Sequence, residues 1–112
     1  MSRKRIVILG STGSIGTQAL DIVRRLPDRF EVLGLAANNN VPLLAEQANE
    51  FKVRFVSIGS ESLLGDLRAQ VGNVATYCGV EGMCTLSTLE EADLIVVAVA
   101  GAIGIAPTHA AL

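Results

Sequence analysis

The sequence is short of the residues that mark several classes of protein. Its 112 residues include no tryptophan, one tyrosine, two cysteines and one histidine. Cys78 and Cys84 form neither a C-x-x-C pair nor, with the distant His109, a zinc set. Nine basic residues against eleven acidic ones give a formal net charge of −2, which argues against a nucleic-acid partner. We therefore expect reduced thiols in a cytoplasmic protein and predict no metal site.

Long apolar runs are also absent. No stretch approaches the ~20 residues that a membrane-spanning helix needs, and the charged start of the chain is followed by too few apolar residues for a signal peptide. We therefore expect no membrane partner. Half of the residues are nevertheless hydrophobic, and the mean hydropathy is +0.47. Either buried strands of an α/β sheet account for this, or part of the surface packs against a missing portion of a longer protein.

The glycine-rich stretch Gly10–Gly16 is the most informative part of the sequence. It follows a run of aliphatic residues typical of a buried strand and precedes an amphipathic stretch, Ser14–Leu26, typical of a helix. Glycine lets a phosphate approach the backbone, and a helix start offers unpaired N–H groups and a positive dipole end. The hydroxyl and amide of Thr12 can both donate to a phosphate oxygen. The pattern G-x-x-G-x-x-G differs from the usual G-x-G-x-x-G, but its context predicts a dinucleotide site.

The remaining apolar patterns alternate between strand and helix. Strands are expected over 6–9, 30–37, 55–58, 74–77 and 94–99, and helices over 14–26, 41–51, 60–71, 79–86 and 103–112. Asn40 or Val41 is expected to cap the second helix, whose apolar stripe comprises Leu43, Leu44, Gln47, Ala48 and Phe51. Residues 87–90 fit a capping box, but a one-turn segment or a loop fits equally well. This order predicts one domain with a three-layer, Rossmann-like parallel sheet and helices on both faces.

The end of the second strand bears on the choice of cofactor. An Asp or Glu about 20 residues past the glycine motif binds the ribose 2′-hydroxyl of NAD, and residues 36–41 contain neither. A 2′-phosphate would therefore meet no repelling charge, and the amides of Asn38, Asn39 and Asn40 can donate hydrogen bonds to it. Neutral donors contribute about 0.5–1.5 kcal/mol each, less than charged ones. The sequence favours NADP over NAD, although a polar turn without a ligand is the alternative.

The small residues Ala98–Gly101 end the fifth strand on the same edge of the sheet as the glycine turn. They would allow a nicotinamide ring or a diphosphate to approach the backbone. Tight packing under the next helix explains them equally well.

Three stretches together resemble one family, the 1-deoxy-D-xylulose 5-phosphate reductoisomerases. They are residues 8–21 around the glycine turn, residues 35–41 with 44–47 around the asparagines, and residues 97–104 with 107–108 at the end of the fifth strand and after it. The resemblance implies an NADPH-dependent enzyme of non-mevalonate isoprenoid synthesis that isomerises and reduces 1-deoxy-D-xylulose 5-phosphate to 2-C-methyl-D-erythritol 4-phosphate. It also implies a homodimer that uses Mg²⁺, Mn²⁺ or Co²⁺.

Site residues carry over from this resemblance by position. Thr12, Gly13, Ser14 and Ile15 match the family's cofactor contacts, and Asn38, Asn39 and Asn40 match its second contact loop. That loop often reads Gly-Lys-Asn or Gly-Arg-Asn, so the first two asparagines depart from the pattern and weaken the expected grip on the 2′-phosphate.

The resemblance also implies that the family's metal ligands, substrate site, lid and C-terminal helical domain lie beyond Leu112. Asp21, Asp28, Asp66, Asp93 and His109 match no catalytic or metal position. We therefore expect residues 1–112 to be the NADPH-binding part of the enzyme, inactive alone, with an apolar surface that normally packs against the rest. The alternatives are a free-standing NADP-binding module and the cofactor domain of another reductase, such as a semialdehyde dehydrogenase.

Overall fold

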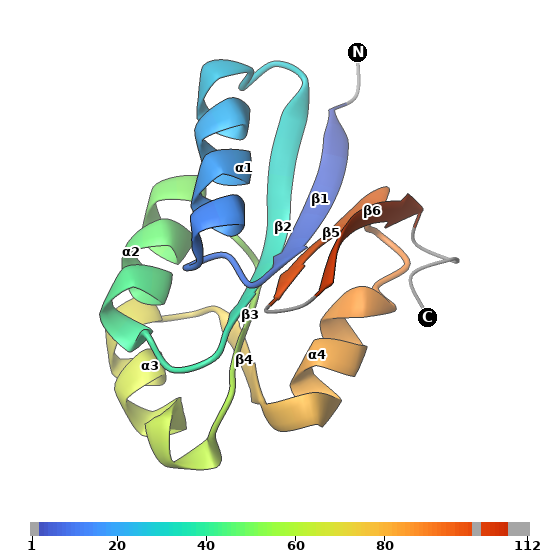
Figure 1. Cartoon of the computed structure of the whole chain (residues 1–112). Helices are drawn as coiled ribbons and strands as arrows, with labels where there is room; N and C mark the ends of the chain where they lie inside the picture. The colour runs from blue at the N-terminus through green and yellow to red at the C-terminus, as the bar shows by residue number, and fades with distance from the viewer. Residues whose placement is uncertain (1–2, 100–101, 108–112) are drawn as a thin grey trace.

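A six-stranded sheet with the strand order β4-β3-β2-β1-β5-β6 forms the centre of the computed structural model, which describes residues 3–99 and 102–107 (Figure 1). The strands are β1 (Lys4–Leu9), β2 (Phe30–Ala37), β3 (Phe55–Ile58), β4 (Ala75–Cys78), β5 (Leu94–Val99) and β6 (Ala102–Pro107). The helices are α1 (Ser14–Arg25), α2 (Val41–Phe51), α3 (Leu64–Val71), preceded by the 3₁₀ turn η1 (Glu61–Leu63), and α4 (Gly79–Ser87).

The chain reverses its direction of winding beside β1. From β1 it steps outward through β2, β3 and β4, and it then returns across the sheet so that β5 pairs with the other side of β1. The pairs among these five strands are all parallel. In open α/β sheets, ligands bind at the carboxyl ends of the strands on either side of such a reversal.

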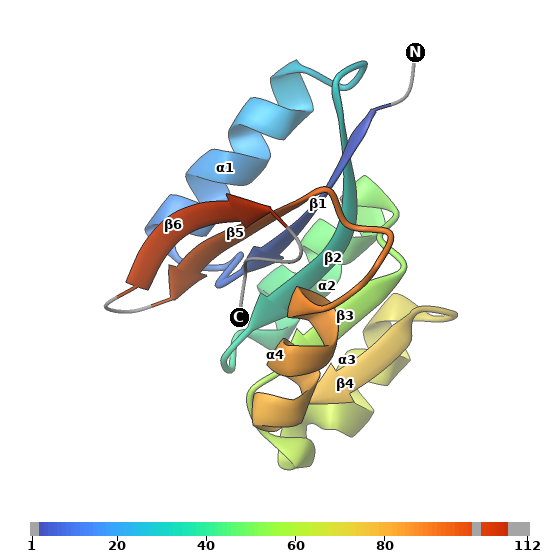
Figure 2. The same ribbon diagram turned by 90° about the vertical axis from the view of Figure 1, so that its right-hand side faces the viewer.

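Helices cover both faces of the sheet, as predicted. Figures 1 and 2 show α1, α2 and α3 on one face and α4 on the other. The core under the three helices includes Leu20, Leu44 and Leu67, whereas Leu86 of α4 packs with the opposite side of the sheet. Because the central strands contribute residues to both cores, consecutive residues are buried in them, 6–9 in β1 and 32–37 in β2.

Most of the predicted elements are confirmed, and several end within a residue or two of the expected positions. The strands β2, β3 and β5 have the predicted bounds, and Asn40 caps α2 by accepting a hydrogen bond from Leu43 N at 3.2 Å. The two free thiols are those of Cys78 and Cys84, as expected. Ser87 ends α4, so the capping-box interpretation of residues 87–90 is wrong and the loop interpretation holds.

The predicted helix over 103–112 is wrong in its described part. Residues 102–107 form β6, which pairs with β5 in the antiparallel direction, and Pro107 stands opposite Leu94 at its end. This pairing satisfies the outer edge of β5, which would otherwise present a row of unpaired backbone groups. Isoleucine at every second position, 103 and 105, fits the period of a strand. Residues 108–112, with His109, lie outside the described part.

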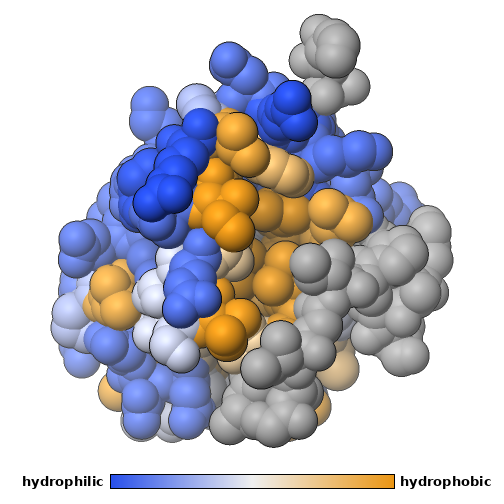
Figure 3. Space-filling model, turned by 45° about the horizontal axis from the view of Figure 1, so that its top comes forward, coloured by the Kyte–Doolittle hydropathy of each residue, from blue (hydrophilic) through white to orange (hydrophobic). Residues whose placement is uncertain are grey.

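An apolar band is exposed on the side of the molecule that faces the reader in Figure 3. Among the described residues, the large exposed hydrophobic side chains include Ile15 and Ile22 of α1 and Leu26 at its C-cap, and their spacing places them along one side of that helix. Among the described residues, no helix is long and apolar enough to cross a bilayer.

Candidate functional site

A cleft of about 530 Å³ opens at the carboxyl ends of the central strands. It lies where the winding direction reverses, between the turn that follows β1, the ends of β2, β3 and β5, and the first turns of α4. Its lining residues are Gly10, Thr12, Gly13, Ala36, Ala37, Asn38, Ile58, Gly59, Gly79, Val80, Met83 and Ala98. This is the position at which doubly wound sheets bind their ligands.

The turn between β1 and α1 is held against β2. The amides of Gly10 and Ser11 both donate to the carbonyl oxygen of Ala36, at 2.7 and 3.0 Å, and the amide of Gly13 donates to the Gly10 carbonyl at 3.3 Å. Gly10 has φ = 92°, a conformation that residues with a Cβ rarely adopt. The backbone path of the turn is thus fixed before any ligand is present.

The glycines of the motif have different structural roles. A Cβ at position 16 would overlap the Gly10 carbonyl oxygen and lie 2.6 Å from the Cα of Ser11, so only glycine lets α1 pack this closely on the turn. At position 13 a Cβ would lie 3.6 Å from that same oxygen, an ordinary contact. Gly13 is exposed and lines the cleft, so its missing side chain leaves open space for a ligand.

The first turn of α1 presents unused amides beside the cleft. Gly13 is its N-cap and supplies no side-chain hydrogen bond, and the first turn carries no acidic residue. Within the described part of the chain, no hydrogen bond uses the amides of Thr12, Ser14 or Ile15. A helix start of this kind carries a partial positive charge and is suited to bind an anion.

The asparagine loop forms another side of the site. Asn38 is exposed and lines the cleft, and its carbonyl accepts a hydrogen bond from Gly59 N at 2.7 Å, which ties the end of β2 to the end of β3. Asn39 accepts from Val41 N through its carbonyl, and the side-chain oxygen of Asn40 caps α2. Neither interaction uses the side-chain NH₂ groups, which therefore can donate to a ligand.

The cleft is electrically neutral. None of its lining residues has an ionisable side chain, and Ile58, Val80 and Met83 give it an apolar wall. Val80 is 79% exposed, so its side chain has little contact with the protein itself. Phosphates bound here would meet neutral amides and no repelling carboxylate.

The structure brings together only some of the residues predicted from the sequence. Thr12, Gly13 and Asn38 line the cleft, whereas Ser14, Ile15, Asn39 and Asn40 are exposed nearby without lining it. The sequence interpretation missed Val80 and Met83 of α4, together with Ile58 and Gly59 at the end of β3. The signal available for these four residues was that they follow or end a predicted parallel strand, because all such ends meet at one edge.

The described residues provide no metal centre. No group of three His, Cys, Asp or Glu side chains gathers in them. Asp21 pairs with Arg24 and Arg25, and the Asp93 carboxylate accepts a hydrogen bond from Arg5 N at 2.8 Å. These acidic groups therefore already have partners that a metal ion would have to replace.

The sheet order, the glycine turn and the cleft at the reversal of winding define a Rossmann-like α/β domain. Residues 6–112 match the 1-deoxy-D-xylulose 5-phosphate reductoisomerase family, and the chain belongs to this family.

Relatives and solved structures agree with this assignment. The reductoisomerase of Thermodesulfovibrio yellowstonii is 47% identical over 109 residues, which are 97% of this chain and 29% of that protein, and the Synechocystis enzyme is 46% identical over 114 residues with the same coverage. The Zymomonas mobilis enzyme, solved in complex with NADPH, superimposes on this chain with a TM-score of 0.83 at 31% sequence identity. The superposition covers 88% of this chain and 26% of the Zymomonas chain.

A second solved reductoisomerase, in complex with NADPH, fosmidomycin and magnesium, has a TM-score of 0.82 at 28% sequence identity. The superposition covers 86% of this chain and 24% of the chain of that enzyme. The chain thus spans about 29% of the length of the curated relatives that it matches.

Proposed function

We propose that this chain is the NADPH-binding part of a 1-deoxy-D-xylulose 5-phosphate reductoisomerase. The observation that carries the proposal is the neutral cleft at the reversal of winding, beside an uncapped helix start whose amides have no partner in the described part of the chain. The family membership and the NADPH in two similar structures support the same ligand.

In this proposal, residues in the cleft and beside it bind different parts of the cofactor. The amides of Thr12, Ser14 and Ile15 bind the diphosphate, and Gly13 leaves the space for it. The side-chain NH₂ groups of Asn38, Asn39 and Asn40 donate to the 2′-phosphate. The apolar wall suits a flat ring of the cofactor. When bound, NADPH supplies a hydride, and the task of these residues is to hold and orient it.

The rest of the reaction belongs to the full-length enzyme in this proposal. The substrate 1-deoxy-D-xylulose 5-phosphate and a divalent cation would bind to segments other than the residues described, because these offer no cluster of metal ligands. The full-length enzyme would be a homodimer, and the 112-residue chain alone would bind cofactor without catalysing the reaction.

A free-standing NADP-binding module is the second candidate. It is favoured by one observation, that the glycine turn and Asn38, which were predicted to bind different phosphates of the dinucleotide, line one cleft within these 112 residues. The two candidates differ in the gene: a reading frame that continues past Leu112 into an acidic metal cluster supports the enzyme, and a stop codon supports the module.

Calorimetric titration of the 112-residue chain with NADPH and NADH tests the binding site. We expect NADPH to bind more tightly than NADH and Val80→Asp to weaken NADPH binding at least tenfold, because a charged carboxylate would replace part of the apolar wall proposed for a flat ring of the cofactor. Ile22→Asp is the matched control: Ile22 is also an exposed aliphatic residue, 56% exposed, but lies on α1 outside the cleft. Absence of heat with both cofactors, or equal effects of the two substitutions, would contradict the proposal.

A further inference from the structure

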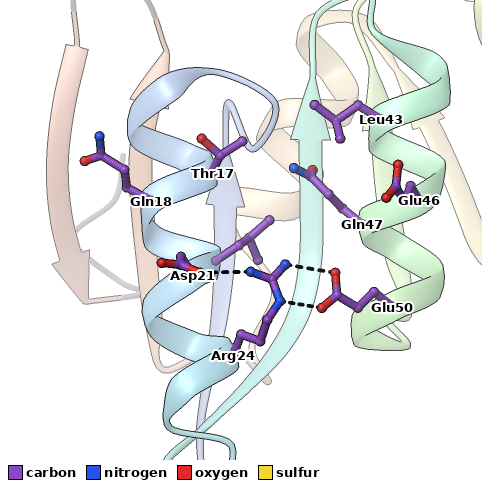
Figure 4. A pocket seen from close by; sticks show the side chains of 9 residues that line it. Thr17, Gln18, Asp21, Arg24, Leu43, Glu46, Gln47 and Glu50 are labelled. Atoms are coloured by element: carbon purple, nitrogen blue, oxygen red, sulfur yellow. Dashed lines mark hydrogen bonds and ion pairs between the residues drawn. The ribbon is translucent and has the colours of Figure 1, made fainter.

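Gln47 is a polar residue in a position that the fold otherwise fills with apolar side chains. It lies on the inner side of α2, is 5% exposed, and neighbours the core residues Leu44 and Ala48. Figure 4 shows its side chain pointing from α2 into the space between α1 and α2, where a pocket of about 320 Å³ lies.

The side chain of Gln47 is bound to the glycine turn. Its Nε2 donates a buried hydrogen bond of 2.9 Å to the carbonyl oxygen of Ser11, which is 36 residues earlier in the chain. The Oε1 atom is buried and accepts no hydrogen bond in the described structure. Burial of a side-chain amide whose oxygen has no hydrogen-bond partner lowers the free energy of unfolding, so packing alone does not explain a glutamine at this position.

Attachment of α2 to the sheet does not require this bond. Leu44, Ala45 and Ala48 of the same helix are buried in the core, and Glu50 joins α2 to Arg24 of α1 by two hydrogen bonds. The bond from Gln47 differs from these contacts because it reaches the turn itself.

The geometry of the peptide bond shows what the contact does. The peptide between Ser11 and Thr12 is trans, so its carbonyl and its N–H point in opposite directions. Gln47 holds the carbonyl toward α2, and the N–H of Thr12 must therefore point away from α2. Thr12 lines the cleft, and its amide has no acceptor in the described part of the chain.

We propose that Gln47 is a positioning residue for cofactor binding, which aims the amide of Thr12 at the cofactor's diphosphate by holding the Ser11 carbonyl on the opposite side. This inference rests on the proposed function for its ligand. The N–H of Ser11 donates to the carbonyl oxygen of Ala36 in β2, and the carbonyl oxygen of Ser11 accepts from Gln47 in α2. Both elements therefore hold the turn in place.

The test compares two substitutions on the same helix. Gln47→Leu replaces the polar side chain by an apolar one of similar size and removes the bond to the turn. Asn49→Leu removes a bond of the same kind, from Asn49 Nδ2 to the carbonyl of Gln70 at 3.0 Å, which lies away from the cleft. We expect Gln47→Leu to weaken NADPH binding five- to twentyfold in the 112-residue chain and Asn49→Leu to change it less than twofold.

Adenosine 2′-monophosphate separates positioning from a general structural role, because it lacks the diphosphate. Its affinity, measured by NMR titration, should be the same in wild type and in Gln47→Leu. Equal losses for this ligand and for NADPH, or full NADPH affinity in Gln47→Leu, would overturn the inference. If Gln47→Leu does not fold, Gln47→Met is tested in the same way.

The ligand-free chain provides a readout that does not depend on the proposed function. We expect Gln47→Leu to shift the Thr12 amide resonance and to lower its heteronuclear NOE, because the peptide loses its anchor, whereas Asn49→Leu leaves both unchanged. An unaltered Thr12 amide would overturn the inference even if NADPH binds. Absence of NADPH binding by the wild type would instead contradict the proposed function, and the Thr12 amide would still decide whether Gln47 orients the turn.

Discussion

Gly13 and Gly16 lie three positions apart in one motif and have different roles. Gly16 is needed for packing, and Gly13 is proposed to leave space for a ligand. At Gly16 the backbone of the turn occupies the place of a side chain, so glycine is needed for the fold. At Gly13 the same place is open and faces the cleft, and the backbone angles, φ = −79° and ψ = 175°, are available to any residue. In the proposed function, the space that the ligand needs accounts for glycine at position 13.

Substitution of the two glycines should separate these roles. We expect Gly13→Val to abolish NADPH binding because the side chain fills the space of the diphosphate, while the free energy of unfolding changes by no more than about 1 kcal/mol. Gly16→Ala should lower the free energy of unfolding by about 1–3 kcal/mol, because backbone atoms must move. Urea denaturation and calorimetric titration of both variants measure this, and unchanged NADPH affinity in Gly13→Val would show that the site is misplaced.

Helices α1 and α2 are joined by a charged contact at the end remote from the cleft. Arg24 on α1 binds Glu50 on α2 through Nε and through Nη2, the latter at 2.9 Å, and also donates from Nη1 to Asp21 at 3.1 Å (Figure 4). The hydrogen bonds from Arg24 lower the pKa of Glu50, and Glu50 in turn raises the pKa of Arg24, which stays charged throughout. The two carboxylates thus hold one guanidinium between the helices.

The contact should make stability depend on pH in the acid range. Because the pKa of Glu50 is lower in the folded chain than the unfolded value of about 4.3, its stabilising contribution is present above that value and is lost as pH falls toward the lowered pKa. A double-mutant cycle with Arg24→Met and Glu50→Gln should give a coupling of up to about 1 kcal/mol at pH 7 in low salt, since both groups are partly exposed. Denaturation at pH 7 and at pH 3 measures it, and an equal coupling at both would contradict the assignment.

The elements that local pattern determines were predictable from the sequence. β2 and β3 are mostly apolar because they are buried between two layers, β5 is apolar with Ile95 fully buried, and Asn40 caps α2 by a local bond. β6 pairs with β5, the strand directly before it in the chain, from Val99 opposite Ala102 to Leu94 opposite Pro107. It was predicted as a helix because the alternation of strands and helices was continued past β5, although Ile103 and Ile105 have the period of a strand. Val80 and Met83 were missed because their place depends on the return of the chain to the opposite face. Gln47 gave a usable signal, since it is the one polar residue in the predicted apolar stripe of α2.

At the scale of the whole molecule, the charge is small and the cleft carries none of it. The formal net charge is −2, and no lining residue is ionisable. Binding of a multiply charged ligand in this cleft depends on hydrogen bonds from neutral groups and on the partial positive charge of the helix start. Both interactions act only at short range.

NADPH binding should therefore be nearly insensitive to salt. Between 0.05 and 0.5 M NaCl we expect the dissociation constant to change less than about threefold, and any change to be toward tighter binding, because salt screens repulsion between the acidic chain and the phosphates. Titration at four ionic strengths measures this. A steep weakening with salt would mean that lysine or arginine side chains hold the phosphates instead.

The placement of β1 also has a consequence for how the chain folds. Its pairing with β2 closes a short loop, but its pairing with β5 brings together segments as far apart as Arg5 and Asp93, separated by 88 residues. Long-range pairing of this kind forms slowly, because the entropy of loop closure is lost before the contact is gained. Until β5 arrives, the strand that leads into the glycine turn exposes an open edge, and this is the stage at which another copy of the chain can add to the sheet and start an aggregate.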